Sequence, residues 1–230
     1  MTGVSNGTWG ASVRSLSGDQ DAFVAKLNGG GALQWNTFLG APPGYQNNDL
    51  DSGIGITAAG NAYVYVAGSS TASWGSPVRG YQGGLTDAFA AKLNAGTGAL
   101  VWNTFLGGGG WFEDYGVDVA VDGSGNVYVT GHGQGAWSLP PVSGFKGMAD
   151  VFATKLDANG NWQWHTFLGS PRDRAKRGYC ARHEWERLRR RLWRSDLGFA
   201  LSTDGGTVGW LCRQVGHQWR FAVERVPRLG

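Results

Sequence analysis

Apolar and β-branched residues alternate with polar or small residues in short runs over the first three quarters of the chain. Clear examples are GVDVAV at 116–121, NVYVTG at 126–131, VFATKL at 151–156 and WQWHTFLG at 162–169. Alternation with a period of two is typical of β-strands that bury one face. Clusters of Gly, Asn, Asp and Ser separate the runs and predict tight turns. The pattern therefore predicts an all-β protein built from short antiparallel strands.

The runs belong to a repeat. DAFVAKLNGGGALQWNTFLG begins at Asp21, and closely similar segments begin at Asp87 and Asp150. A second block, GIGITAAGNAYVYVAGSS from Gly53, recurs as GVDVAVDGSGNVYVTGHG from Gly116. The period of somewhat over sixty residues is too long for a helical-pair repeat and suits a multi-stranded unit such as a propeller blade. Each unit is predicted to be a four-stranded antiparallel meander made of two hairpins.

We expect about two and a half such blades. A partial blade covers 1–40, and full blades cover 41–107 and 108–170. The segment TGVSNGTWGASVR from Thr2 aligns with AGSSTASWGSPVR from Ala67, so the chain is expected to begin inside a blade. The missing blades of a longer chain are then expected partners of these repeats, because closed propellers need roughly four to eight blades.

Three motifs recur in order: YV[AT]G, DxF[AV][AT]KL and W[NH]TFLG. Over roughly residues 2–170 they make the chain resemble the bacterial SBBP β-propeller repeat family. The resemblance implies seven-bladed propellers in secreted or surface-associated bacterial proteins, hence an extracellular or cell-surface location. It implies no established reaction.

The last quarter of the chain departs from this pattern. Residues 1–170 carry 6 Lys and Arg against 11 Asp and Glu, whereas residues 171–230 carry 14 against 6. From Pro171 the turn glycines are lost and arginine becomes frequent. A basic arm for nucleic acid or a membrane surface is one interpretation. No run of eighteen apolar residues occurs, so the sequence predicts no membrane span.

We favour a frameshift for this segment. We shifted the reading frame forward by one base, so that each new codon joins the last two bases of one codon to the first base of the next. In this frame the DNA of residues 182–200 can encode DTSGNVYVAGYGDPTWGSP, and that of residues 209–229 can encode DGFVAKLDTNGALQWNAFLGS. Tryptophan has only one codon, TGG, so every tryptophan of this segment must be read as glycine in the shifted frame. The repeat has glycine at all four of these positions, which are Trp185, Trp193, Trp210 and Trp219. We therefore expect 171–230 to be a fourth repeat out of frame, irregular or partly helical, and nucleic acid not to be a partner. Both cysteines lie in this segment, so no disulfide framework is predicted.

Two sets of aromatic residues are candidates for binding or packing. One tryptophan recurs on a strand with a phenylalanine three residues later; these could form a sugar-stacking platform, but we favour packing between blades. They are Trp35, Trp102 and Trp164 with Phe38, Phe105 and Phe167. A second set, Trp9, Trp74 and Trp137, is predicted to lie in the loops between hairpins. Loop packing is the favoured interpretation of this set, and because loop residues often carry function, the set also provides the candidate ligand-binding residues.

Oxygen-bearing side chains at the blade junctions suggest a second kind of site. Asn47, Asn48, Asp49 and Asp51 are matched in the next unit by Glu113 and Asp114. Such hard ligands suit calcium, whereas turn-forming, solvated acids are the plainer interpretation. Lysines at one strand position, Lys26, Lys92 and Lys155, are interpreted as an outward face or as partners of Asp21, Asp87 and Asp150 rather than as an active ring.

The sequence contains no HExxH, GxSxG, P-loop or CxxC motif, and nothing indicates a catalytic acid, base or nucleophile. No cofactor is expected beyond the calcium alternative. We expect a non-catalytic binding or scaffolding propeller with a glycan or protein ligand. Two alternatives stay open: the propeller portion of a carbohydrate-active enzyme, and a calcium-stabilised adhesion module.

Overall fold

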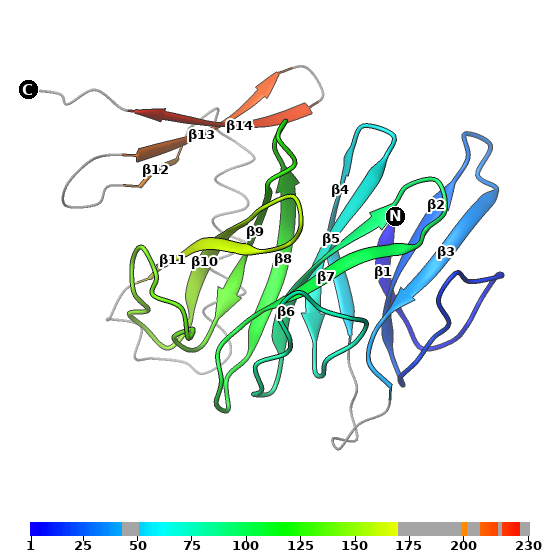
Figure 1. Cartoon of the computed structure of the whole chain (residues 1–230), viewed down its shortest axis with the longest axis horizontal. Helices are drawn as coiled ribbons and strands as arrows, with labels where there is room; N and C mark the ends of the chain where they lie inside the picture. The colour runs from blue at the N-terminus through cyan, green and yellow to red at the C-terminus, as the bar shows by residue number, and fades with distance from the viewer. Residues whose placement is uncertain (43–50, 170–198, 202–207, 216–217, 226–230) are drawn as a thin grey trace, which may run out of the picture. The chain divides into compact units, whose positions relative to one another are not determined.

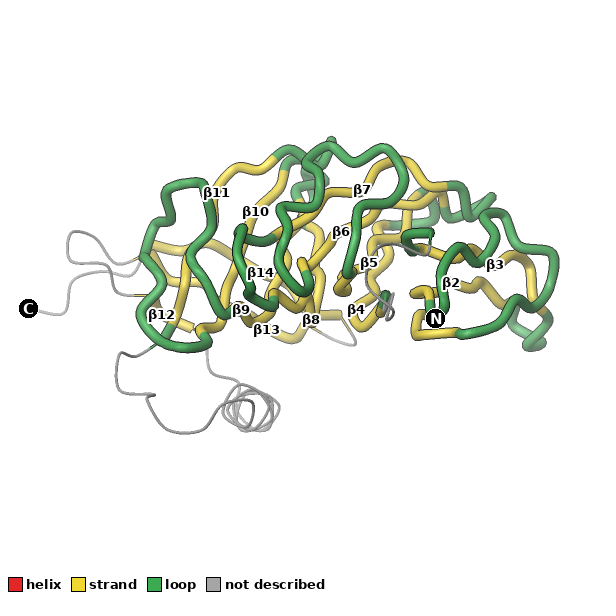
Figure 2. The backbone as a smooth tube through the Cα atoms, turned by 90° about the horizontal axis from the view of Figure 1, so that it is seen from below, coloured by secondary structure: helices red, strands yellow, loops and turns green. Residues whose placement is uncertain are grey.

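The computed structural model describes residues 1–42, 51–169, 199–201, 208–215 and 218–225. Throughout these ranges the regular elements are β-strands joined by loops (Figure 2). The chain divides into two compact units, Met1–Ala175 and Lys176–Gly230. Within the described ranges no helix is long and apolar enough to cross a membrane.

The first unit contains three antiparallel sheets (Figure 1). The first sheet has the order β1-β2-β3, formed by Thr2–Ser5, Asp21–Leu27 and Leu33–Leu39. The second has the order β4-β5-β6-β7, formed by Ser52–Ala59, Tyr63–Ser70, Asp87–Asn94 and Leu100–Leu106. The third has the order β8-β9-β10-β11, formed by Asp114–Val121, Val127–Gly133, Asp150–Leu156 and Trp162–Leu168. Neighbours in space are neighbours in sequence, which confirms the predicted meander and the all-β class.

A register shift recurs at the same place in all three sheets. It follows the lysine of the DxF[AV][AT]KL motif, which lies on β2, β6 and β10. In the first sheet it falls between Lys26 and Leu27, where β2 pairs with β3. Such a bulge leaves one residue of the partner strand unpaired and re-aims the side chains beside it. In each sheet the shift leaves the lysine directly opposite the strand tryptophan: Lys26 with Trp35, Lys92 with Trp102, and Lys155 with Trp164.

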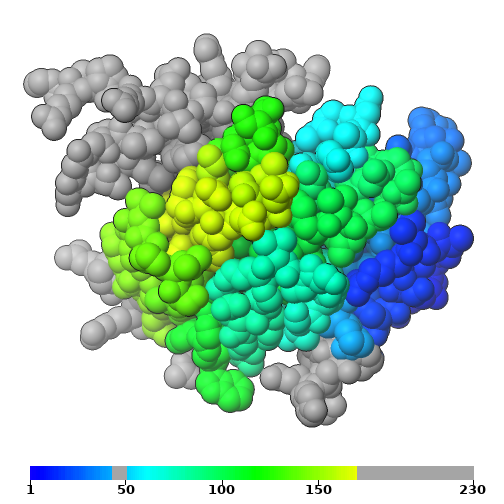
Figure 3. Space-filling view, in the orientation of Figure 1, coloured from blue at the N-terminus to red at the C-terminus, as the bar shows by residue number. Residues whose placement is uncertain are grey.

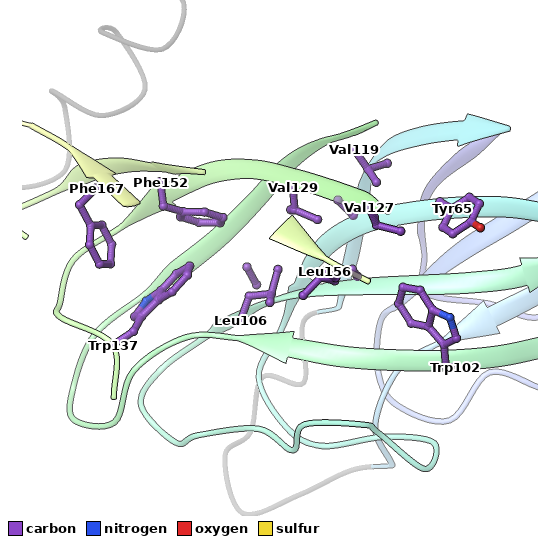
Figure 4. Close-up of a cluster of buried hydrophobic side chains, with 13 residues drawn as sticks. Tyr65, Trp102, Leu106, Val119, Val127, Val129, Trp137, Phe152, Leu156 and Phe167 are labelled. Atoms are coloured by element: carbon purple, nitrogen blue, oxygen red, sulfur yellow. The ribbon is translucent and has the colours of Figure 1, made fainter. Parts of the chain in front are cut away.

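The cores lie between neighbouring sheets, which pack side by side in Figure 3. One cluster joins the first two sheets and includes Val24, Trp35 and Phe89. The other joins the second and third sheets; Figure 4 shows Trp102 beside Tyr65, with residues of β8 to β11 completing the cluster. Burial of apolar area between sheets is the main stabilising contribution in such a stack.

Two glycines allow strands of adjacent sheets to approach closely. A Cβ on Gly116 of β8 would lie 2.6 Å from the carbonyl oxygen of Gly68 in β5. A Cβ on Gly55 of β4 would lie 2.7 Å from the Cα of Asp118 in β8. No side chain fits at these points, so glycine is required where β8 packs on the preceding sheet.

The second unit contains a three-stranded antiparallel sheet with the order β12-β13-β14, formed by Phe199–Leu201, Val208–Val215 and Gln218–Arg225. This corrects the expectation of an irregular or partly helical segment for the residues described. The strand QWRFAVER alternates polar and apolar residues with period two, which favours a strand over a helix. The segment 184–193, where helix was expected, lies outside the described residues.

Candidate functional site

The strand tryptophans join neighbouring blades. The indole Nε1 of Trp35 donates a hydrogen bond to the carbonyl oxygen of Ala95 in the following blade, at 3.1 Å. The indole of Trp102 does the same to Ala158, also at 3.1 Å. Both rings are buried, and Trp164 of the third sheet is partly buried. The phenylalanines three residues later, Phe38, Phe105 and Phe167, are fully buried.

The lysines opposite these tryptophans reach the same carbonyl groups. Lys26 Nζ donates to Ala95 O at 2.9 Å, and Lys92 Nζ donates to Ala158 O at 3.3 Å. Of the two interpretations of the lysines, an outward strand face or pairing with Asp21 and its equivalents, the pairing does not occur in the first sheet, where Lys26 is exposed. Asp21 and Lys26 stand five residues apart on β2, so at roughly 3.3 Å per residue they lie at opposite ends of the strand.

The loop tryptophans pack inward against their own blades. Trp74 is 3% exposed and Trp137 is 5% exposed, and each ring lies edge-on against a strand phenylalanine. Figure 4 shows the Trp137 ring beside Phe167 and Phe152. Trp9 is partly buried and packs on Phe23 at 5.2 Å between ring centroids.

These are the contacts expected for loop packing, the favoured interpretation of Trp74 and Trp137, and not those of rings displayed on the surface. Loop packing describes their environment, because almost none of either side chain faces solvent. In the second blade the amide of Asn103 also donates to the carbonyl of Trp74 at 2.8 Å, and Asn36 donates to Trp9 at 2.6 Å. The asparagine of the WNTFLG motif thus holds the loop onto the blade.

Histidine replaces this asparagine in the third blade. His165 is fully buried and lies against Trp137, at 5.0 Å between ring centroids. Burial, together with a smaller effect of the nearby Arg79 guanidinium, lowers the pKa of His165 to about 4. The imidazole is therefore neutral at pH 7 and serves as an aromatic packing group.

The acidic candidates separate into two places. Asn48 and Asp49, with Asn47, lie outside the described residues. Asp51 immediately precedes β4 at the junction between the first and second blades, whereas Glu113 and Asp114 lie at the junction between the second and third. Among the described residues no three His, Cys, Asp or Glu side chains are gathered in a way that would hold a metal ion. The described candidates are therefore not brought into one site.

Each junction instead holds a pair of buried carboxylates, a feature that sequence reasoning missed. A Cβ on Gly40 would overlap carboxylate oxygens of both Asp21 and Asp51. A Cβ on Gly107 would overlap Asp87 and would lie 3.1 Å from Asp114. The recurring glycine of the TFLG motif thus makes room for two acids. The recurring glycine of this motif was visible in the sequence. The second aspartate of each pair comes from the next blade, so the sequence did not show that two acids meet there.

Burial dominates the electrostatics of these acids. It raises the pKa of Asp51 to about 7, that of Asp87 to about 7 and that of Asp114 to about 6. Each also retains one carboxylate oxygen without a hydrogen bond among the described residues. Part of the charge is offset by backbone donors, such as Ala41 N to Asp51 at 2.9 Å and Gln82 N to Asp87 at 2.7 Å.

An arginine lies near each carboxylate pair. Arg14 donates to the carbonyl oxygens of Phe38 and Gly40 at 3.0 and 2.8 Å. Arg79 donates to those of Phe105 and Gly107 at 2.8 and 3.0 Å. A planar guanidinium suits such a two-point contact. Each arginine therefore ties the loop between hairpins to the last strand of its blade.

One aromatic residue contrasts with these buried groups. Trp111, in the loop between β7 and β8, is 81% exposed, and the adjacent Phe112 is 41% exposed. Next to them, Gln134 Nε2 donates to Glu113 Oε2 at 2.9 Å. Sequence reasoning missed Trp111 because it does not recur between units, and only its solvent exposure identifies it as a candidate.

A family model described as a β-propeller repeat, SBBP, matches residues 104–136. The matched segment runs from β7 through β8 and β9 and includes the Trp111 loop. The match agrees with the resemblance found in the sequence motifs. No curated protein matches the chain.

Proposed function

We propose that this chain, which carries a β-propeller repeat of the SBBP type, is a non-catalytic binding or scaffolding module of a secreted or cell-surface bacterial protein. The observation that carries the proposal is a difference between residues that recur from unit to unit and a surface residue that does not. Side chains that recur between units, such as Lys26, Trp35 and Arg14, are used within and between blades. Trp111, which does not recur between units, faces solvent. Rigid scaffolds with variable surface loops commonly serve recognition.

The burial of the acids supports binding over catalysis. A general acid or base must reach the substrate within hydrogen-bonding distance. Asp51, Asp87 and Asp114 have raised pKa values, a property that active sites often share. Each is at most 1% exposed, however, and lies within a blade junction. A bound substrate could not reach these carboxyl groups. A carbohydrate-active enzyme is therefore the less favoured alternative.

Binding and turnover can be separated in one set of experiments. The chain would be screened on a glycan array and in parallel incubated with the same glycans, with products followed by mass spectrometry. Binding of a glycan or a protein without turnover is the expected result. Hydrolysis or elimination of a bound glycan would overturn the proposal in favour of an enzyme.

We also propose that residues 171–230 are an out-of-frame fourth repeat, so that their positive charge has no role in binding nucleic acid. The support is the match of both shifted-frame segments to the repeat, with tryptophan codons giving glycine where the repeat needs it. The three-stranded sheet of β12 to β14 does not decide between this origin and a native basic arm, because alternating residues form strands in either case.

A further inference from the structure

The loop that carries Trp111 is held firmly although its aromatic residue is exposed. It joins β7 to β8. Leu85 N donates to Phe112 O at 2.9 Å, and Asp114 N donates to Thr86 O at 2.7 Å. A parallel bridge also pairs Thr86 with Glu113. The backbone on the C-terminal side of Trp111 is therefore fixed by the preceding blade.

Close glycine contacts add to this rigidity. Gly84 and Gly110 both have a positive φ, of 103° and 105°. A Cβ on Gly84 would lie 2.7 Å from Gly110 O and 2.8 Å from Phe112 O. A Cβ on Gly135 would lie 2.5 Å from the Phe112 ring. The segment thus packs tightly below Trp111, and the indole is displayed on a preorganised support.

A tryptophan exposed on such a support contributes little to the stability of the fold. Large aromatic residues stabilise a fold mainly when buried, as are two other loop tryptophans, Trp74 and Trp137. A preorganised aromatic ring loses little conformational entropy on binding, which increases affinity. The geometry is that of a recognition element.

The surroundings of Trp111 indicate the chemistry of the ligand. The Glu113 and Gln134 side chains form a hydrogen-bonded pair beside the loop and offer acceptors and donors to hydroxyl groups. Residues 1–170 carry an excess of Asp and Glu over Lys and Arg, which disfavours an anionic ligand. A flat apolar ring next to such a pair suits a pyranose, which has an apolar C–H face and a rim of hydroxyls.

We propose that Trp111 is the stacking platform of a binding site for neutral polysaccharide, with Glu113 and Gln134 bonding the sugar hydroxyls. This rests on the proposed function of the module as a binding protein. A protein partner is less favoured, because aromatic anchors of protein interfaces lie within larger apolar areas that exclude water. Trp111 instead adjoins Phe112, glycines and the polar pair.

Affinity electrophoresis tests this directly. The chain and its variants would be run in native gels cast with soluble xylan, mixed-linkage β-glucan or glucomannan, and in a polygalacturonate gel as the anionic comparison. At least one neutral polysaccharide should retard the unchanged chain, and polygalacturonate should not. Trp111→Ala should weaken retardation by tenfold or more, whereas Trp111→Phe should retain part of it.

Val142→Ala is the matched control. Val142 is 62% exposed in the loop between β9 and β10, so this change removes exposed apolar surface elsewhere and should leave retardation unchanged. Equal retardation of the unchanged chain and Trp111→Ala would overturn the stacking site while leaving a binding function intact. Retardation by polygalacturonate alone, or by none of the gels, would overturn the proposed ligand class. If the chain instead captures a protein and Trp111→Ala abolishes capture, the site is a protein interface and the saccharide proposal is wrong.

Discussion

Lys26 and Trp35 donate hydrogen bonds to one and the same carbonyl oxygen, that of Ala95 in the following blade, at 2.9 and 3.1 Å. A carbonyl oxygen has two lone pairs, so it can accept both. The β-bulge after Lys26 leaves the two side chains opposite each other on adjacent strands. Lys92 and Trp102 repeat the arrangement on Ala158 one blade later. The repeat thus encodes its own connection to the next repeat.

Substitution of the turn glycine that contacts a strand tryptophan should lower stability more than substitution of the equivalent turn glycine that contacts no tryptophan. Gly160 has a φ of 83°, and a Cβ there would lie 2.9 Å from the Trp102 ring. Gly31 occupies the corresponding turn of the first blade with the same φ of 83°, and nothing lies within 4 Å of its Cβ position. Gly31→Ala should cost about 1–2 kcal/mol through backbone strain alone. Gly160→Ala should cost roughly 1–3 kcal/mol more through overpacking.

Urea unfolding of both variants measures this difference. Equal destabilisation would show that the contact between Trp102 and the Gly160 turn contributes nothing beyond backbone strain.

Loop and strand tryptophans should contribute comparably to stability. Trp74→Ala and Trp102→Ala should each lower the free energy of unfolding by about 3–5 kcal/mol, because both rings are buried and large-to-small aromatic changes leave cavities. Trp111→Ala should change it by less than about 0.5 kcal/mol, as expected for an exposed site. Chemical denaturation followed by circular dichroism measures all three. A small effect of Trp74→Ala would show that its loop detaches from the blade.

The junction acids should make the fold less stable as the pH rises. Asp51 has a folded-state pKa of about 7, above its usual value of 3.8, so between these values the folded state holds a proton that the unfolded state has released. The contribution of this group is therefore fully present below about pH 4 and is lost as the pH rises to about 7. Asp87 and Asp114 act in the same direction.

Asp51→Asn isolates one of these acids. The amide oxygen can still accept the hydrogen bond from Ala41 N, but it carries no charge. The variant should gain most stability over the parent chain at pH 8 and least at pH 4, in thermal unfolding at both pH values. Arg14 and Asp21 face Asp51 across the junction and are unchanged in this comparison. A difference between variant and parent that does not change with pH would contradict the raised pKa.

The DNA that encodes the chain should reveal the frameshift. We expect a one-base insertion or deletion upstream of the Gly178 codon, followed by an alternative frame that spells VYVAG and FVAKLD. Resequencing of the coding region is the measurement. Stop codons in that frame, or a frame without these motifs, would establish residues 171–230 as a native basic segment.

The sequence by itself determined the strands, their order and the repeat. Period-two alternation and turn residues act locally, so DAFVAKL and WNTFLG specify a hairpin wherever they occur. The packing of Trp35 between blades also followed from sequence, because a large aromatic residue at a recurring strand position needs a recurring partner. The alternating residues of β14 carried a strand signal as well, although the arginine-rich composition around them favoured another interpretation.

Only the tertiary structure decided which polar and aromatic groups meet. Asp21 and Asp51 are thirty residues apart and come together because β4 begins beside the end of β3, with Gly40 leaving space for both acids. Trp74 and Trp111 both lie in loops rich in glycine, yet one is buried and the other is exposed. The difference depends on where each loop docks, which is determined by contacts with other strands and loops. Local propensity contains no information about such long-range contacts, and this is why burial had to come from the structure.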